Sequence, residues 1–329
     1  MGLREFAIRR IIHLVFVFWL FMSILFFLFR LLPGDPSTTF AMSGLSPEAR
    51  QEIIESFGLD RPLYVQYIDY MLQFVQGNMG RSYIGSDPVS VILVEKAIHT
   101  FALMGTGITI AYIFAFFFGS LLGWKRGSRF ERFGIVGTLM ARSSPQFWTG
   151  IILLMIFVFW LGWFPSAGMG TVGGANESYF NRFVSLDFLH HLFLPALTVA
   201  IFYMATPTLL MRSSLLEILN EDYIDMKHAQ GLSPMRILFY HGSRNAILPL
   251  VTIAAVITGR MFGGAVVVET VFNWPGMGRA MVNAVNQNDF PLAMGAFFVM
   301  GSITIIANFV ADILYVYLDP RIEYDSEGS

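Results

Sequence analysis

The sequence contains no cysteine, and charged side chains make up only 13% of its 329 residues. Without cysteine the chain can form neither a disulfide framework nor a zinc site built on thiolates. The formal net charge of −2 provides no basic surface for nucleic acid. No Gly-x-x-x-x-Gly-Lys-Ser/Thr, His-Glu-x-x-His or Gly-x-Ser-x-Gly segment occurs. The chain is therefore expected to hold no cofactor, no metal and no catalytic residue of its own.

What the sequence has in excess is apolar side chains, which account for 55% of the residues and include 33 Phe. The 19 residues between Arg10 and Arg30 carry no formal charge. At about 1.5 Å per residue they are long enough to cross the hydrocarbon of a membrane. A cleaved signal peptide is the competing interpretation, but the run is too long and no small-residue cleavage site follows. Six spans are expected, at residues 10–30, 100–124, 134–162, 190–212, 246–268 and 292–318.

Basic residues predict how these spans are oriented. They cluster before the first span, after the second and after the fourth, whereas the alternate short loops hold only Arg182 and Arg279. Cytoplasmic loops carry the excess of Lys and Arg, so both termini and the loop 213–245 are expected in the cytoplasm. With no internal repeat and no long hydrophilic run, residues 1–329 are expected to form one multi-pass, all-α membrane domain.

Two external segments carry further helical signals. In the external region 31–98, Pro62 opens and Gly77 closes a stretch with apolar residues at helical spacing, and Ser46-Pro47 opens an earlier one. This external region could form a platform that binds a receptor or a cap that packs on the helix bundle, and the cap is the favoured interpretation. A re-entrant hairpin or outer gate is a further possibility at Glu269, Trp274, Pro275 and Gly276.

The loop 213–245 is charged and interrupted, between two strongly apolar stretches. Asn220 is expected to cap a first short helix, which Gly231 ends in the left-handed conformation. Ser233 then caps a second helix with Pro234 at its first position. From the residues alone, an ordinary interfacial hairpin and a socket for an external partner are equally open.

Motifs in a fixed order along nearly the whole chain bear on that choice. They include residues 32–36 (Leu-Pro-Gly-Asp-Pro), 144–148 (Ser-Pro-Gln-Phe-Trp), 244–249 (Arg-Asn-Ala-Ile-Leu-Pro), 264–272 (Gly-Ala-Val-Val-Val-Glu-Thr-Val-Phe) and 318–321 (Leu-Asp-Pro-Arg). In these motifs the chain resembles the dipeptide/oligopeptide (and nickel) branch of the ABC-importer permeases. The resemblance implies the type I permease fold in the cytoplasmic (inner) membrane, with six transmembrane helices and a helical external region between the first two.

The same resemblance implies a role for the loop. In that family a cytoplasmic Glu-Ala-Ala motif, followed after three residues by glycine, carries the coupling helix that docks into an ATPase subunit. Asp225, Met226 and Lys227 fall on the triplet, which is literally absent, and Gly231 falls on the glycine. The expected coupling residues are Glu221, Asp222, Tyr223, Asp225, Lys227, Ala229, Gly231, Leu232, Ser233, Pro234 and Arg236.

The partners implied are a second homologous permease, two ABC ATPase subunits that bind ATP and Mg²⁺, an extracytoplasmic substrate-binding protein and membrane lipid. The substrate implied is a dipeptide or oligopeptide, with a nickel chelate or an oligosaccharide as the alternative. A self-powered secondary transporter is the rival outside this class, and it would show inverted repeats or midplane ion sites.

Polar groups inside the spans are the remaining candidates. Arg142, Arg260, Asn308 and Asp312 lie within apolar stretches, where a charge at a helix centre costs about 2.5–3.5 kcal/mol. Asn308 and Asp312 share one helix face. Arg260 could form an ion pair with Asp312 or line the translocation path. An intramembrane enzyme would need paired groups of this kind. His190 and His191 are adjacent and face different ways on a helix, so an interfacial pair is favoured over a metal site.

Overall fold

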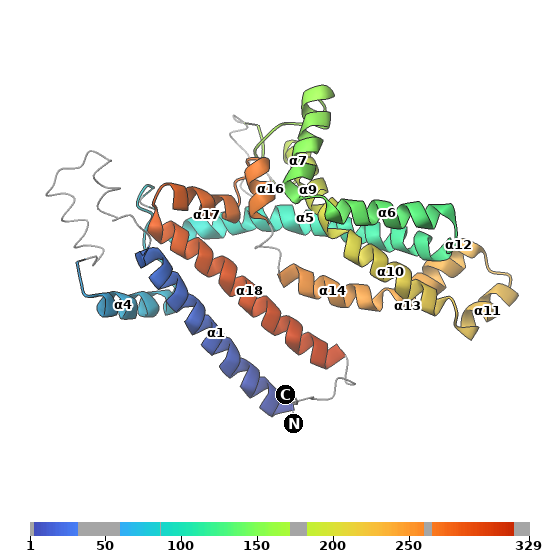
Figure 1. Cartoon of the computed structure of the whole chain (residues 1–329), viewed down its shortest axis with the longest axis horizontal. Coiled ribbons are helices and arrows are strands. Elements are labelled where there is room, and N and C mark those ends of the chain that lie inside the picture. Colours follow the sequence, from blue (N-terminus) through green and yellow to red (C-terminus); the bar gives the residue numbers. More distant parts are fainter. Residues whose placement is uncertain (1–2, 32–59, 86, 172–182, 260–264, 319–329) are drawn as a thin grey trace. The chain divides into compact units, whose positions relative to one another are not determined.

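The computed structural model describes residues 3–31, 60–85, 87–171, 183–259 and 265–318. These residues are almost entirely helical, and the bridge between Arg81 and Pro88 is the only extended pairing among them. The α-helices, labelled in Figure 1, are α1 (Leu3–Leu31), α4 (Leu63–Val75), α5 (Val89–Trp124), α6 (Arg129–Ser143), α7 (Gln146–Leu153), α9 (Leu186–Tyr203), α10 (Ala205–Ile218), α11 (Asp222–Ala229), α12 (Pro234–Arg236), α13 (Ser243–Ala246), α14 (Leu248–Gly259), α16 (Val266–Val271), α17 (Met277–Asn286) and α18 (Phe290–Leu318). Two π-helices, η1 (Leu154–Trp160) and η2 (Ile237–Gly242), complete the set in the described residues. The all-α membrane fold expected from the sequence is confirmed.

Within the described residues, four helices are long and apolar enough to cross a membrane: Ile8–Arg30, Val89–Trp124, Leu186–Tyr203 and Phe290–Val310. A fifth candidate is the bent pair formed by α6 and the α7–η1 helix. The expected span 246–268 is described only as α14 and the start of α16, because residues 260–264 lie outside the described part. The first expected external helix, opened at Ser46-Pro47, also lies outside it.

The expected span 134–162 is not one straight helix. α6 ends at Ser143 and α7 begins at Gln146, with a bend of 103° between the two halves. Ser144 has a ψ of 129° because the ring of Pro145 disfavours the helical conformation in the residue before it. Pro145 also has no N–H to continue the helical ladder. The chain therefore makes a sharp corner at this proline.

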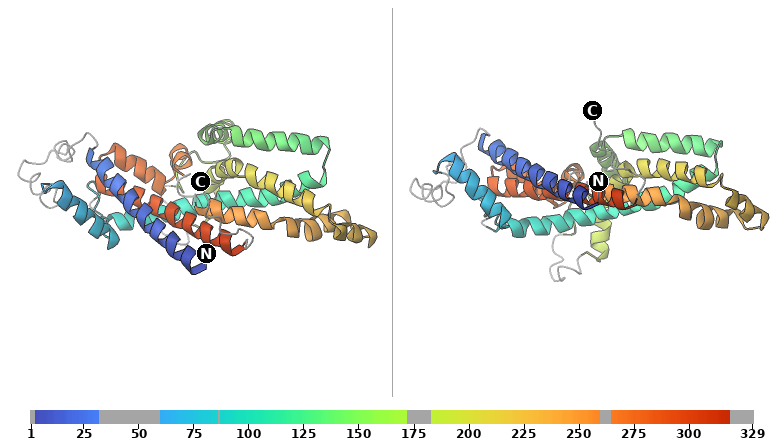
Figure 2. Two further views of the ribbon diagram at one scale, coloured as in Figure 1. Left: turned by 60° about the horizontal axis from the view of Figure 1, so that its bottom comes forward. Right: turned by 90° about the horizontal axis from the view of Figure 1, so that it is seen from below.

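The chain divides into two compact units, and each is described separately. The first comprises Met1–Ile98 and Gly276–Ser329. In it α1 and α18 lie side by side and antiparallel (Figures 1 and 2), with Phe18 packed on Phe298 and Phe29 on Phe290. The ring of Phe21 occupies the space where Gly301 of α18 has no side chain. Aromatic rings therefore fill most of the interface between these two helices.

A buried carboxylate fixes the loop before α5 to the start of α18. Asp289 is 1% exposed, and it accepts hydrogen bonds from the Ser82 hydroxyl and, at 3.1 Å, from the Tyr83 backbone N–H. Burial is the main reason that the pKa of Tyr83 is raised, to about 12, so its phenol is neutral at physiological pH. Asp289 thus satisfies backbone and hydroxyl donors that would otherwise be buried without a partner.

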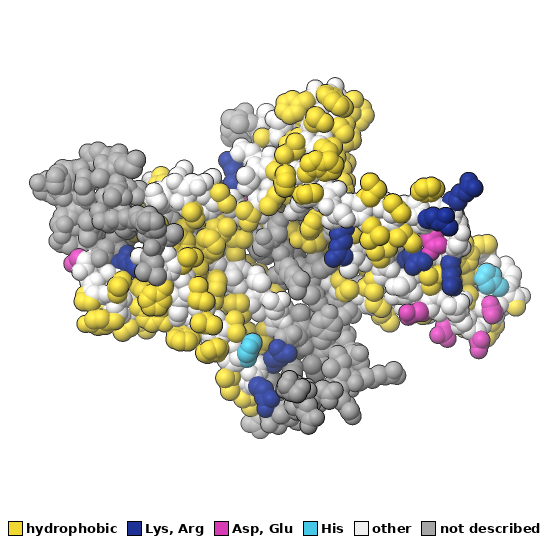
Figure 3. Space-filling view, viewed as in Figure 1, with side chains coloured by type: hydrophobic (Ala, Val, Ile, Leu, Met, Phe, Trp, Pro, Cys, Tyr) yellow, Lys and Arg dark blue, Asp and Glu magenta, His cyan; other side chains and the backbone are white. Residues whose placement is uncertain are grey.

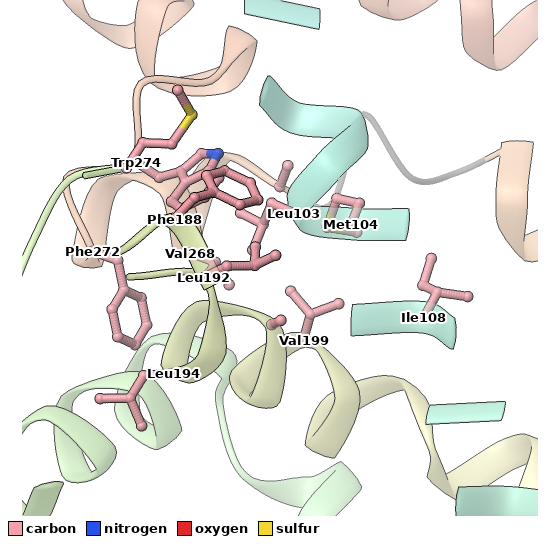
Figure 4. Packing of buried hydrophobic residues seen from close by; sticks show 13 residues of the cluster. Leu103, Met104, Ile108, Phe188, Leu192, Leu194, Val199, Val268, Phe272 and Trp274 are labelled. Atoms are coloured by element: carbon pink, nitrogen blue, oxygen red, sulfur yellow. The ribbon is translucent and has the colours of Figure 1, made fainter. Parts of the chain in front are cut away.

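The second unit, His99–Pro275, has a core in which α5, α9 and the α16 region meet. Leu103 and Met104 of α5 pack with Leu192 and Val199 of α9, and Figure 4 shows the side chains of this cluster together. Gly107 permits the close approach, since a Cβ there would lie 2.6 Å from Val199 Cβ. Close packing of this kind rigidifies the contact between the helices.

Further along α5, Gly119 makes an equally close crossing with α10. A Cβ at Gly119 would lie 2.6 Å from the Thr208 carbonyl oxygen and 2.8 Å from Met211 Cβ. This part of α5 thus forms a close helix crossing.

Gly119→Ala is expected to destabilise the chain by about 1–3 kcal/mol, because the added methyl must displace backbone and a buried side chain. The matched control is Gly137→Ala in α6, where a Cβ would meet nothing within 4 Å. Denaturant unfolding of the purified chain in detergent measures both variants. Equal stability of the two variants would contradict the close crossing.

Candidate functional site

The loop 213–245 folds into short helices joined at a glycine. α11 runs from Asp222 to Ala229, and Gly231 follows it with a φ of +73°, as expected for a helix-ending glycine. Ser233 precedes α12 and Pro234 is its first residue, also as expected, although the Ser233 side chain makes no capping hydrogen bond. The expected N-cap at Asn220 is wrong. Glu221 occupies that position, while the Asn220 amide donates to the Leu216 carbonyl at 2.8 Å and so closes α10.

One side of the loop 213–245 packs against the rest of the second unit. Ile224, Ile237 and Leu238 are buried, and Leu238 joins a cluster with Met211 and Leu215 of α10. This apolar contact fixes η2 to α10, and α11 packs on η2.

Hydrogen bonds reinforce that attachment. The Ser243 hydroxyl donates to Ser120 Oγ of α5 at 2.9 Å, in buried surroundings. The Tyr223 hydroxyl donates to the His241 carbonyl at 3.2 Å and accepts from the Asn245 amide at 2.9 Å. These bonds join α11 to η2 and α13, and they join α13 to the long helix α5.

The other side of the loop is exposed and mixed in character. Met226, Met235 and Tyr240 are each more than half exposed. Among the expected coupling residues, Asp222, Asp225 and Arg236 are exposed too, whereas Leu232 is half-buried. In Figure 3 the charged side chains at this end of the unit gather around α11 and the start of α6. Exposed apolar side chains rimmed by charges are typical of a surface that binds another protein.

An ion pair braces the turn between α5 and α6 against α10. Glu131 is buried at 6% exposure and accepts hydrogen bonds from both Nε (2.7 Å) and Nη2 of Arg212. Its second oxygen accepts from the Gly127 N–H at 2.6 Å, while the Glu131 N–H donates to Ser128 Oγ. The carboxylate therefore accepts three hydrogen bonds, two of them from Arg212, the residue that precedes the loop 213–245.

Arg212→Met is expected to cost about 1–3 kcal/mol of stability, because it leaves the Glu131 carboxylate buried without its main donor. The double variant Arg212→Met with Glu131→Gln should recover part of the loss. The control is Arg132→Ala, which removes an exposed charge from α6, the helix that carries Glu131. This control should leave the stability unchanged. Unfolding midpoints in detergent measure all three. A single variant as stable as the control would contradict the bracing role.

Two of the four residues expected at an outer gate are fully buried in the second unit. Glu269 and Trp274 are both 0% exposed. The Thr100 hydroxyl donates to Glu269 Oε1 at 2.6 Å, and the Trp274 indole N–H donates to the His99 carbonyl at 3.0 Å. The Pro275 carbonyl lies 3.0 Å from His99 Nδ1, and Gly276 precedes α17. The buried side chains attach α16 and the segment that follows it to α5, and a gating role stays a prediction.

The polar residues expected inside the membrane are only partly described. Arg142 of α6 is exposed and donates to the Thr206 hydroxyl at the start of α10, at 2.8 Å. Asn308 is exposed on α18. Arg260 and the side chain of Asp312 lie outside the described residues, so their pairing stays a prediction.

No group of three His, Cys, Asp or Glu side chains suited to a metal ion occurs in the described part of the chain. His190 and His191 use different partners. His190 Nε2 lies 2.7 Å from the Trp163 carbonyl, and His191 Nδ1 lies 2.8 Å from the Asp187 carbonyl. This arrangement agrees with two separate structural roles for the histidines.

The sequence matches two models that describe one family of membrane proteins. Residues 107–324 match the family model of the binding-protein-dependent transport system inner membrane component, and residues 3–103 match the N-terminal model of the same membrane component. The chain belongs to this family. Members are membrane components of transport systems, which agrees with the several apolar helices of a multi-pass membrane protein.

Named relatives cover nearly the whole chain. An oligopeptide transport system permease protein (AppB) of Bacillus subtilis is 38% identical over 301 residues, which are 91% of this chain and 93% of the relative. A di/tripeptide transport system permease protein (DppB) of Pseudomonas aeruginosa is 33% identical over 337 residues, with 97% and 99% covered. A dipeptide transport system permease protein (DppB) of Alkalihalophilus pseudofirmus is 31% identical over 330 residues, with 97% and 99% covered.

Sequence reasoning missed the Ser120–Ser243 bond and the Glu131–Arg212 pair. Ser128 followed three residues later by Glu131 is a capping-box pattern, and it could have pointed to a role for this carboxylate. Nothing local identifies Arg212 or Ser243 as the partners, since the paired residues are 81 and 123 positions apart.

Proposed function

We propose that this chain is the transmembrane permease subunit of an ATP-driven ABC importer for dipeptides or oligopeptides. It pairs with a second homologous permease, and the translocation path runs between the two. The assembly contains two ATPase subunits that hydrolyse ATP with Mg²⁺, and one of them binds the loop 213–245 from the cytoplasm. An extracytoplasmic binding protein delivers the substrate. Both chain termini lie on the cytoplasmic side in this arrangement.

The observation that carries this proposal is the two-sided loop. Ile224 and Leu238 fix it to the helix bundle, and Met226 and Met235 remain exposed on its other side. A segment built this way can bind a partner and still transmit displacement to α5 and α10. ATP and substrate shift the permease between inward-open and outward-open states only if each binds the two states with different affinity.

Peptide as the substrate is inferred from the names of the relatives, which are oligopeptide, di/tripeptide and dipeptide permeases. A nickel chelate or an oligosaccharide remains the alternative cargo for the same machinery, since the binding protein sets much of the choice.

Uptake by intact cells tests the substrate class. A strain that lacks this chain should lose uptake of a labelled tripeptide, and the cloned chain should restore it. An excess of unlabelled peptide should compete, whereas a nickel chelate and an oligosaccharide should not. Loss of nickel or oligosaccharide uptake with unchanged peptide uptake would overturn the peptide assignment.

A further inference from the structure

Helix α4 presents three distinct faces. At about 100° per residue, its side chains fall into three sectors around the helix axis. Tyr67, Tyr70 and Phe74 share one sector; Gln66, Asp69 and Gln73 share a second; and Tyr64, Ile68, Leu72 and Val75 share the third. A helix that only caps a bundle needs one apolar face and one polar face, so the third sector calls for a separate explanation.

The first sector packs against α1 and α18. The Tyr67 ring lies 5.4 Å from Phe26 of α1, and its hydroxyl is 2.8 Å from Ser23 Oγ. Phe74 is buried, and its ring lies 4.8 Å from that of Phe298 in α18. These contacts confirm the expected helix between Pro62 and Gly77 and agree with the favoured interpretation of it as a cap on the bundle.

The third sector is apolar, and the described residues of this chain leave it exposed. Its exposed fractions run from 52% at Ile68 to 80% at Val75. None of its four side chains carries a charge. The only polar group is the Tyr64 hydroxyl at one end, and an amphipathic aromatic of this kind suits the membrane interface. The neighbouring polar sector carries Asp69, which accepts a hydrogen bond from exposed Arg61 at 3.2 Å.

The contacts with α1 place this sector at membrane depth. α1 contains the candidate span Ile8–Arg30, and α4 contacts it at Ser23, Phe26 and Phe27. Ser23 precedes Arg30 by seven residues, which is about 10 Å of helix. An interfacial helix buries its apolar face about 5–10 Å into the boundary between headgroups and acyl chains.

The exposed apolar surface also continues from α4 onto α1. Ile24, Phe27 and Leu28 are about half exposed near the contact with α4. Because α1 is a candidate span, its exposed apolar side chains suit contact with lipid. The neighbouring third sector of α4 can contact the same lipid.

We propose that α4 lies in the interfacial layer of the membrane at the end of α1, with Tyr64, Ile68, Leu72 and Val75 in contact with lipid. The polar sector faces water, and the tyrosine-rich sector holds the helix to α1 and α18. This inference rests on the membrane location of the proposed permease, and it is independent of the cargo.

Because this chain has no cysteine, an introduced cysteine is its only labelled position, and the parent transporter labelled in parallel gives the signal from the partner subunits. Ile68→Cys and Leu72→Cys are compared with Gln73→Cys in the adjacent polar sector. Each variant of the full transporter is labelled with an environment-sensitive fluorophore and placed in phosphatidylcholine–phosphatidylglycerol vesicles. Quenching is measured with a lipid that carries a nitroxide near its headgroup and with aqueous iodide.

At Ile68 and Leu72 we expect strong quenching by the nitroxide lipid and at least a severalfold lower iodide quenching than at Gln73. Iodide quenching at Ile68 and Leu72 equal to that at Gln73 would overturn the inference. Protection from both quenchers, lifted when the binding protein is removed, would also overturn it and assign the sector to a protein partner. Peptide uptake by the same vesicles reports separately on the proposed function.

Discussion

Replacing Trp274 by alanine is expected to give the largest loss of stability of any single change considered, about 3–5 kcal/mol. The indole is fully buried among α5, α9 and the segment after α16, with the Phe188 ring 5.8 Å away. The change removes a large apolar side chain, leaves a cavity and deprives the His99 carbonyl of a donor. Denaturant unfolding of the purified chain in detergent measures the effect.

Two further variants separate the contributions. Trp274→Phe keeps most of the packing and loses the hydrogen bond to His99, so a smaller loss of about 0.5–1.5 kcal/mol is expected. Trp160→Ala is the matched control, because Trp160 is 72% exposed at the end of η1 and its removal opens no core cavity. If Trp274→Ala were as stable as Trp160→Ala, the segment after α16 would not be attached to the core as described.

The second large effect is expected at the exposed side of the loop 213–245. The double variant Met226→Asp with Met235→Asp should lose the ATPase subunit during purification of the complex. Both methionines are just over half exposed, and a central apolar contact of an interface is worth about 2 kcal/mol or more, which is roughly 30-fold in affinity. Recovery of the ATPase with the tagged chain from solubilised membranes measures the loss.

Conservative changes at the same positions control for this effect. Met226→Leu with Met235→Leu retains apolar side chains of similar volume, so the ATPase should remain bound. Membrane insertion and unfolding midpoint of both double variants should match the parent chain, because neither methionine is buried. Undiminished ATPase recovery with the aspartate variant would show that the partner does not bind this side of the loop.

Local signals in the sequence identified most of the helical elements. Pro62 and Gly77 bracket α4, Gly231 has the left-handed conformation, and Pro234 opens α12, all as the residue types predict. At Asn220 two adjacent residues could each cap a helix. The preceding helix decided the outcome by using the Asn220 side chain to close its own last turn.

Long-range contacts could not be derived from the same signals. The burial of Glu269 depends on Thr100, which lies 169 positions away, and Glu131 is paired with a residue from α10. The angle of the corner at Pro145 depends on how its two flanking helices pack, so the proline indicates where the chain bends without fixing by how much. The expected coupling residues follow from family resemblance, whereas the division of the loop into a buried and an exposed side required the structure.

Uptake by vesicles that contain the purified complex tests most directly whether this chain transports by means of an ATPase partner. With binding protein outside and ATP on the side of the loop 213–245, the vesicles should accumulate labelled peptide, and omission of either ATP or binding protein should abolish it. Accumulation at the same rate without ATP, driven by an imposed proton or sodium gradient, would contradict the account.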